Sequence, residues 1–171
     1  MNRLIHFLTF AALVLGMVSC SLGRKKTWTY EPSADGSTAI IVSGKAVPPA
    51  NIPHAVLRAV SAGNRICGKP YLMGGGHRRF EDKAYDCSGA VSYLLHHAGC
   101  LSAPTTSSAL RKFGEKGEGR WITVYAKNGH TFISVAVLRM DTGYHGEREG
   151  PRWTTHSRPA KGYVARHPEG L

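Results

Sequence analysis

The 171-residue chain is predicted to form an α+β domain, in which helices pack on a small antiparallel β-sheet. Two observations predict this class. Apolar residues recur at helical spacing in two segments of the first hundred residues, and β-rich segments joined by a turn signal follow in the second half. The length suits one domain with a short terminal segment. Its composition, 42% hydrophobic and 19% charged residues, is globular and excludes collagen-like, coiled-coil and wholly disordered chains.

The first predicted helix begins after Asn51, a residue type that caps helices. Its apolar stripe includes Val56, Ala59 and Val60, which recur at helical spacing. The helix is expected to end by Gly68, because the proline that comes shortly after it cannot continue a helix. A run of three glycines, residues 74–76, then permits positive φ angles and a close approach by another segment of backbone.

The second predicted helix spans residues 87–98, with Asp86 as its N-cap and Gly99 just beyond its last turn. Cys87 lies in the first turn, four residues before Val91, so its thiol belongs to the apolar stripe that faces the protein. A helix N-terminus and a nearby imidazole both favour the thiolate, which is the nucleophilic form. A buried structural cysteine is the alternative interpretation.

Two strands are predicted over residues 120–126 and 130–138, joined by the turn signal Lys127-Asn128-Gly129. His130 therefore opens a strand of a sheet that can cover the second helix. A cysteine at a helix N-terminus that faces a histidine on a sheet is the arrangement of papain-type acyl transfer. A last strand is predicted after Gly162.

The beginning of the chain is predicted to be an export signal. Residues 1–19 have a basic start and an apolar run that is too short to span a bilayer. Cys20 comes directly after, and the segment resembles the lipobox of bacterial lipoproteins, in which this cysteine is lipidated and becomes the new N-terminus. A plain secretory signal is the alternative. The resemblance implies a lipid-anchored protein of the cell envelope, on the periplasmic side of the outer membrane in a Gram-negative host.

The segment 20–50 is predicted to be a tether between the lipidated Cys20 and a compact domain over residues 51–171. It is polar and basic at first and contains the stiff pair Pro48-Pro49. The net charge of the whole chain is +11, and loss of residues 1–19 removes only Arg3 among the fixed charges. A surface this basic favours anionic neighbours, such as lipid headgroups or acidic polymers.

Three motifs together resemble the NlpC/P60 family of cysteine peptidases, which cut bacterial cell-wall peptides. They are Pro70-Tyr71 with Gly74-Gly75, the helix start Asp86-Cys87-Ser88-Gly89, and Gly129-His130 at the start of a strand. The resemblance covers about residues 51–171. It implies a reduced papain-like fold and a peptidoglycan endopeptidase that acts through an acyl-enzyme on the stem peptides.

The resemblance also implies a role for each matching residue. Cys87 would be the nucleophile and His130 the general base. Tyr71 would shape the oxyanion site or hold the substrate, while Asp86 and Ser88 would line the neighbouring subsite. No cofactor and no metal are expected, since no His-x-x-x-His pair occurs, and the enzyme is expected to be a monomer.

In this family a third polar residue orients the histidine from the next strand, roughly a dozen residues further along the chain. Asp141, eleven residues after His130, is the first candidate. The family often has His, Asn or Gln there, so a carboxylate is a departure, although it suits the task of holding an imidazole. His145 is the second candidate and His156 the third.

A register argument opposes Asp141. If the chain reverses at residues 137–138, Asp141 pairs near Ser134, about 13 Å along the strand from His130. The same register places His145 opposite His130. A bulge or a strong twist would be needed to bring Asp141 to the imidazole.

Other possibilities remain open from the residues alone. Cys67 and Cys100 are either a disulfide or two separate thiols. The same scaffold could serve a thiol amidase or acyltransferase, or a catalytically inactive lipoprotein that binds the cell wall. Nucleic-acid binding is not expected, because the chain carries an export signal and lacks interleaved aromatic and basic residues.

Overall fold

The computed structural model describes residues 27–143 and 149–171, and its centre is a six-stranded antiparallel sheet. The strands lie in the order β4-β10-β5-β6-β7-β8, with bounds β4 Glu115–Lys116, β5 Ile122–Lys127, β6 His130–Val135, β7 Leu138–Asp141, β8 Arg152–Thr154 and β10 Val164–His167. The helices are α1 His54–Ile66, α2 Cys87–Ala98 and the single turn α3 Ser107–Leu110. The predicted α+β class is confirmed.

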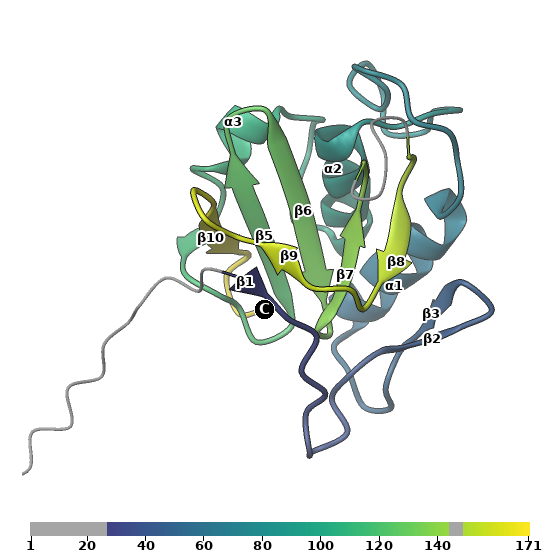
Figure 1. The fold of residues 1–171 in the computed structure, drawn as a ribbon, viewed down its shortest axis with the longest axis vertical. Helices are drawn as coiled ribbons and strands as arrows, with labels where there is room; N and C mark the ends of the chain where they lie inside the picture. Colours follow the sequence, from purple (N-terminus) through teal and green to yellow (C-terminus); the bar gives the residue numbers. More distant parts are fainter. Residues whose placement is uncertain (1–26, 144–148) are drawn as a thin grey trace, which may run out of the picture.

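Helices α1 and α2 cover one face of the sheet, and a two-stranded ribbon crosses the other face (Figure 1). The ribbon pairs β1, Thr27–Trp28, with β9, Arg158–Pro159. A separate hairpin of β2, Ile40–Val42, and β3, Lys45–Val47, lies beside α1. The main core fills the space between helices and sheet, and a smaller aromatic cluster lies on the ribbon side, formed by Trp28, Tyr125, Phe132 and Tyr163.

Helix α1 forms where the periodicity predicts it, and Val56, Ala59 and Val60 are all buried. The predicted cap is wrong. Pro53, with extended φ and ψ angles, precedes the first helical residue, whereas Asn51 lies outside the helix at φ 58°. An asparagine tolerates this left-handed conformation better than most residues, so it serves the turn before the helix instead.

Helix α2 has the predicted bounds and the predicted caps. The Asp86 carboxylate accepts a hydrogen bond from the Gly89 N–H at 2.7 Å, and Gly99 ends the helix at φ 86°. The third helical residue must be glycine, because a Cβ on Gly89 would collide with the carbonyl oxygen of Gly75. The glycine run therefore lies directly against the first turn of α2, as its lack of side chains allows.

The hairpin of β5 and β6 confirms the turn prediction at residues 127–129, and His130 is the first residue of β6. The next reversal differs from the expectation. It lies at Ala136 and Val137, which both have positive φ angles as in a tight two-residue hairpin turn, and it pairs Ser134 with Arg139. The ladder then brings Asp141 to the level of Phe132. The predicted pairing of Asp141 with Ser134 is thus wrong by two residues.

The segment expected to be a tether is folded onto the domain from residue 27 onward. Trp28 is only 4% exposed and lies in the aromatic cluster under the ribbon. Ala39 and Ala46 are buried in the main core, and the Asn64 side chain bonds both the N–H and the carbonyl of Ala46 at 2.8 Å. The open face of the sheet and one side of α1 need this cover, because they would otherwise expose apolar surface.

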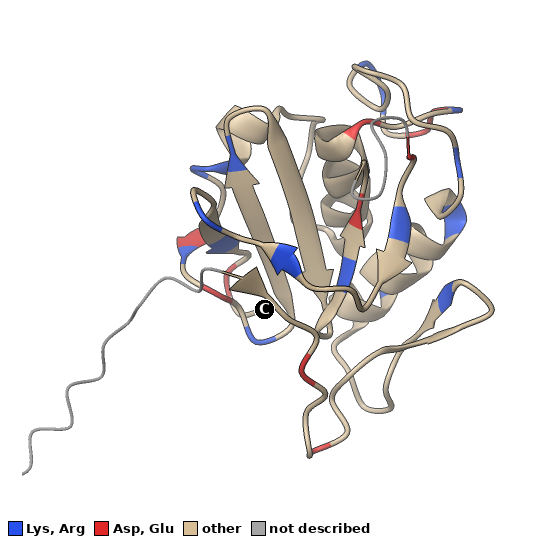
Figure 2. Cartoon of the chain, viewed as in Figure 1, with Lys and Arg blue, Asp and Glu red and all other residues tan. Residues whose placement is uncertain are grey.

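The predicted signal, residues 1–19, and the predicted lipidation site Cys20 lie outside the described residues. Within residues 27–143 and 149–171, no helix has the length and the apolar character needed to cross a bilayer. In the view of Figure 2, basic residues lie on several loops and strands.

Candidate active site

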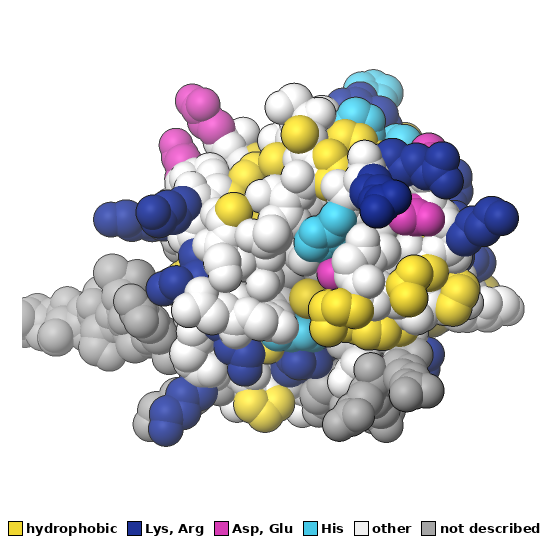
Figure 3. All heavy atoms as spheres, turned by 90° about the horizontal axis from the view of Figure 1, so that it is seen from above, with side chains coloured by type: hydrophobic (Ala, Val, Ile, Leu, Met, Phe, Trp, Pro, Cys, Tyr) yellow, Lys and Arg dark blue, Asp and Glu magenta, His cyan; other side chains and the backbone are white. Residues whose placement is uncertain are grey.

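The thiol of Cys87 and the imidazole of His130 meet at the end of the sheet where α2 and β6 begin. Seen from this end, the surface shows histidine side chains beside a group of basic side chains (Figure 3). Burial, the largest influence, lowers the pKa of His130. Hydrogen bonds to Asp141 and Cys87 and the negative charges of both outweigh it, so the pKa is raised above its usual 6.5.

Asp141 fixes the orientation of the imidazole. The Nε2 atom of His130 lies 2.9 Å from Oδ1 of Asp141, whose side chain is 1% exposed. An imidazole has two ring nitrogens, so this bond leaves Nδ1 to serve the thiol of Cys87. The register found for β7 makes the contact possible, because Asp141 is the diagonal neighbour of His130 across the two strands.

The Asp141 carboxylate is itself held by three further donors. The Thr142 N–H donates to Oδ1 at 2.8 Å, and Arg158 donates to Oδ2 at 2.6 Å. Arg139, which is fully buried, also donates to Oδ2. The carboxylate is therefore fixed in one orientation, as a residue that orients a histidine must be.

Tyr163 and Lys127 complete the ribbon side of the site, and sequence reasoning missed both. The ring of Tyr163 meets that of His130 edge to face at a centroid distance of 6.3 Å. The ammonium of Lys127 lies over the same tyrosine ring at 4.7 Å. Tyr163 precedes the last strand by one residue, and only the pairing of β10 with β5 brings it here, which no local signal reveals.

Asp86 is buried and its oxygens serve the local fold. Besides capping α2, its carboxylate accepts from the Gly74 N–H at 3.0 Å and from the Ser88 hydroxyl at 3.1 Å. Both Asp86 and Ser88 are 4% exposed. These bonds tie the glycine run to the first turn of α2, so the two residues predicted to line a subsite fix the position of the helix start.

His77 is a second imidazole near the start of α2, and no sequence motif gives it a role. Its Nε2 lies 3.0 Å from both the Asp86 carboxylate and the Ser88 hydroxyl. A serine relay would need the carboxylate on one ring nitrogen and the hydroxyl on the other. Because one nitrogen faces both, His77, Asp86 and Ser88 do not form a second triad.

Tyr71 lies close to the thiol, as the predicted role requires. Burial, followed by the negative charges of Cys87 and Asp86, raises the pKa of Tyr71, so its hydroxyl stays protonated and able to donate. The two residues after it, Leu72 and Met73, are 59% and 78% exposed. The rim of the site on this side is therefore apolar.

Of the two other candidates for the residue that orients His130, the structure describes only His156. His145 lies outside the described residues. His156 contributes its backbone carbonyl, which accepts from Arg139 at 3.1 Å. Cys67 and Cys100 are both free, so they form no disulfide. In the described part of the chain, no group of three or more His, Cys, Asp or Glu side chains is arranged to hold a metal ion.

Comparison with known proteins adds no relative to this picture: no protein-family model matches the chain, and a search of curated proteins returns no match. The geometry of the site is therefore the main basis for assigning a function to the protein.

The raised pKa of His130 predicts a pH-dependent stability. The folded state binds this proton more tightly than the unfolded chain, in which the pKa is 6.5. The stabilisation is fully present below that pH and is lost as the pH rises through the folded-state pKa. Relative to His130→Gln, the free energy of unfolding of the wild type should therefore fall as the pH rises from about 6 through the folded-state pKa of His130. Urea denaturation at several pH values measures this, and parallel curves for the two proteins would contradict it.

Proposed function

We propose that this protein is a cysteine endopeptidase that hydrolyses the stem peptides of the bacterial cell wall. The observation that carries the proposal is the line of three groups at one end of the sheet. Cys87 opens α2, His130 opens β6 within reach of the thiol, and Asp141 fixes the far nitrogen of the imidazole at 2.9 Å. This arrangement activates a nucleophile for acyl transfer.

The chemistry is set by the positions of the protons. The Cys87 thiolate attacks the carbonyl carbon of a peptide bond, and the C–S bond forms as the carbonyl oxygen takes the negative charge. The His130 imidazolium gives its proton to the leaving nitrogen, the C–N bond breaks and an amine departs. Water then loses a proton to His130 and adds to the thioester, which releases a carboxylic acid and regenerates the thiolate.

The first turn of α2 supplies donors for the oxyanion. Two N–H groups of this turn already have partners: that of Gly89 donates to the Asp86 carboxylate and that of Ala90 to the Asp86 carbonyl. The N–H groups of Cys87 and Ser88 belong to the same turn, and the helix geometry points them toward its N-terminal end. Backbone donors at this position stabilise the negative oxygen as it forms.

The substrate class rests on charge and on the sequence motifs. Cell-wall stem peptides carry carboxylates, which suit a chain with a net charge of +11. The resemblance of the Asp86-Cys87-Ser88-Gly89 helix start to the NlpC/P60 family supports the same class. An export signal with lipidation at Cys20 would place the enzyme in the cell envelope, next to this substrate.

Digestion of purified sacculi tests the proposal. The wild type is expected to release muropeptides whose masses show a cut within the stem peptide. Cys87→Ala should release none, and His130→Ala should be slower by about 10²–10⁴-fold, because proton transfer is lost. Cys67→Ala removes a free thiol outside the site and should cut like the wild type.

Two outcomes would contradict the proposal. One is equal cleavage by the wild type and Cys87→Ala, since the thiol would then have no role. The other is absence of cleavage by the wild type, which would favour an inactive wall-binding protein. A cut at the bond between sugar and peptide would instead show an amidase on the same scaffold.

A further inference from the structure

The carboxylate of Asp141 lies between one imidazole and two guanidinium groups. Oδ1 serves His130, and Oδ2 accepts from both Arg139 and Arg158, the latter at 2.6 Å. The Arg139 side chain is 0% exposed and that of Arg158 is 14% exposed. Burying two cations next to one carboxylate is costly, so the arrangement calls for an explanation beyond the stability of the fold.

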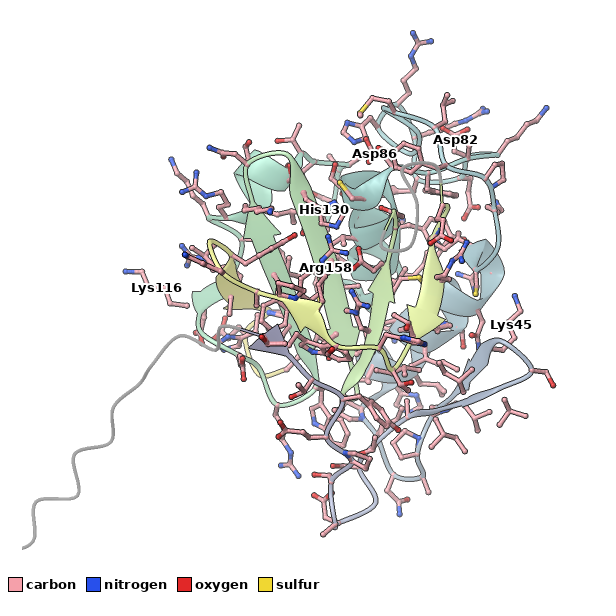
Figure 4. All side chains as sticks on the ribbon, viewed as in Figure 1. Lys45, Asp82, Asp86, Lys116, His130 and Arg158 are labelled. Atoms are coloured by element: carbon pink, nitrogen blue, oxygen red, sulfur yellow. The ribbon has the colours of Figure 1, made fainter. Side chains whose placement is uncertain are left out.

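The two arginines reach Asp141 from different parts of the chain. Arg139 lies two residues earlier on β7, on the same face of the strand. Arg158 lies on β9, which crosses the open face of the sheet and pairs with β1 at Trp28. Figure 4 shows the Arg158 side chain over the same face of the sheet as His130.

Aromatic rings hold both guanidinium groups in place. The Arg139 guanidinium lies 5.3 Å from the ring centroid of Trp28 and 5.7 Å from that of Phe132. The Arg158 guanidinium lies 5.6 Å from the Phe132 centroid and also donates to the Tyr163 hydroxyl at 3.4 Å. Neither arginine can leave Asp141 without giving up these contacts.

We infer that Arg158, supported by Arg139, is a positioning residue that acts on His130 through Asp141, by offsetting the charge of the carboxylate that holds the imidazole. The inference rests on the proposed function, in which His130 moves protons for Cys87. The two arginines and Asp141 together carry a net charge of +1, whereas a lone carboxylate would carry −1. This cluster therefore stabilises the imidazolium form of His130 less than an Asp141 carboxylate without arginine partners would.

The charged and titratable groups around His130 come from α2, β5, β7 and β9 and from the residue just before β10. Cys87 on α2 and Asp141 on β7 favour the protonated imidazole. Tyr163, just before β10, packs against it as a neutral ring. Arg158 on β9 and Arg139 on β7 act from behind Asp141 and oppose protonation. Lys127 on β5, over the Tyr163 ring, acts in the same direction.

The test is an NMR titration of His130 in a Cys87→Ala background, which removes the contact between the thiol and the imidazole. Removal of one cation by Arg158→Met should raise the pKa of His130 by about one pH unit, and Arg158→Gln should shift it in the same direction. Arg158→Lys keeps the charge and should stay within about 0.3 unit of the parent. The two neutral variants keep the test valid if one of them fails to fold.

Arg152→Met is the matched control. Arg152 is the cross-strand neighbour of Asp141 on β8, and its side chain is 44% exposed and paired with Glu149. Exposed ion pairs are screened by solvent, so this variant should shift the His130 pKa by less than about 0.3 unit. An equal shift in Arg152→Met and Arg158→Met would show a general effect of net charge and would overturn the inference.

The sign of the shift separates a residue that offsets the charge of Asp141 from one that only holds the carboxylate in place. If Arg158 merely supports the fold, Asp141 swings away in Arg158→Met and the pKa of His130 falls or does not change, which overturns the inference. The titration needs no substrate, so a failure to cut sacculi would overturn the proposed function and leave this result standing. With cleavage established, Arg158→Lys should restore the wild-type pH profile that Arg158→Met shifts upward.

Discussion

Asp141→Ala is expected to lower the free energy of unfolding by about 3–5 kcal/mol, because it leaves buried cations without their counter-charge. Arg139 is completely buried, and Arg158 and His130 also direct N–H groups at this carboxylate. Water cannot reach the Arg139 side chain, which is 0% exposed, to replace the lost oxygen atoms. Removal of one partner from such a cluster costs more than any single contact in it contributes.

Urea denaturation of Asp141→Ala and wild type near neutral pH measures this loss. Asp35→Ala is the control, since Asp35 is an exposed turn carboxylate bonded to Ser37, and its free energy of unfolding should stay close to that of the wild type. The double variant Asp141→Ala, Arg158→Met should lose less free energy of unfolding than the two single variants lose together. The second change removes a cation that the first leaves unpaired. A loss below about 1 kcal/mol for Asp141→Ala would show that the arginines find other partners.

The parts of the site that sequence reasoning could locate are those with local signals. The cap Asp86, the first-turn Cys87 and the closing Gly99 are all set within one helix, whose end preferences arise from its own unsatisfied N–H and C=O groups. His130 comes after an Asn-Gly turn, which favours one hairpin geometry. These predictions needed no knowledge of distant contacts, and the structure has the helix and the hairpin where they were expected.

The predicted register opposes the contact between Asp141 and His130, and the error in this register has a specific physical reason. The reversal lies at Ala136 and Val137, residues that rarely adopt positive φ angles and give no turn signal. Tertiary contacts stabilise this turn, since Ala136 is bonded to the carbonyl of Trp121 at 2.7 Å. A shift of two residues keeps every side chain on its face, so the hydrophobic pattern alone could not distinguish the two registers.

His77, Tyr163 and Arg158 could not be assigned for a different reason. Each is polar or aromatic, lies in a loop or a short strand and has no periodic pattern around it. Their place at the site depends on contacts between segments far apart in the chain, such as the pairing of β1 with β9. Two-residue strands are shorter than any period that a sequence pattern can establish.

A chain that begins at Asn51, the boundary the sequence predicted for the domain, is expected not to form a stable fold. It would lose Trp28, which is 4% exposed beneath the ribbon, and the loss of one buried tryptophan costs about 3–5 kcal/mol. It would also lose Ala39 and Ala46 from the main core. The sum is comparable to the whole stability of a small domain, roughly 5–15 kcal/mol.

The effect should reach the site because β1 pairs with the strand that carries Arg158. Without β1, strand β9 has no strand to pair with, and Arg158 is no longer held beside Asp141. A chain that begins at Ser21 keeps β1 and the hairpin of β2 and β3, and it should unfold cooperatively and alkylate at Cys87 with the pH profile of the full chain. Thermal unfolding and iodoacetamide labelling of the two shortened chains compare them directly. Equal unfolding temperatures would mean that residues 27–50 only rest on the domain, and this segment would then have no part in shaping the thiol site.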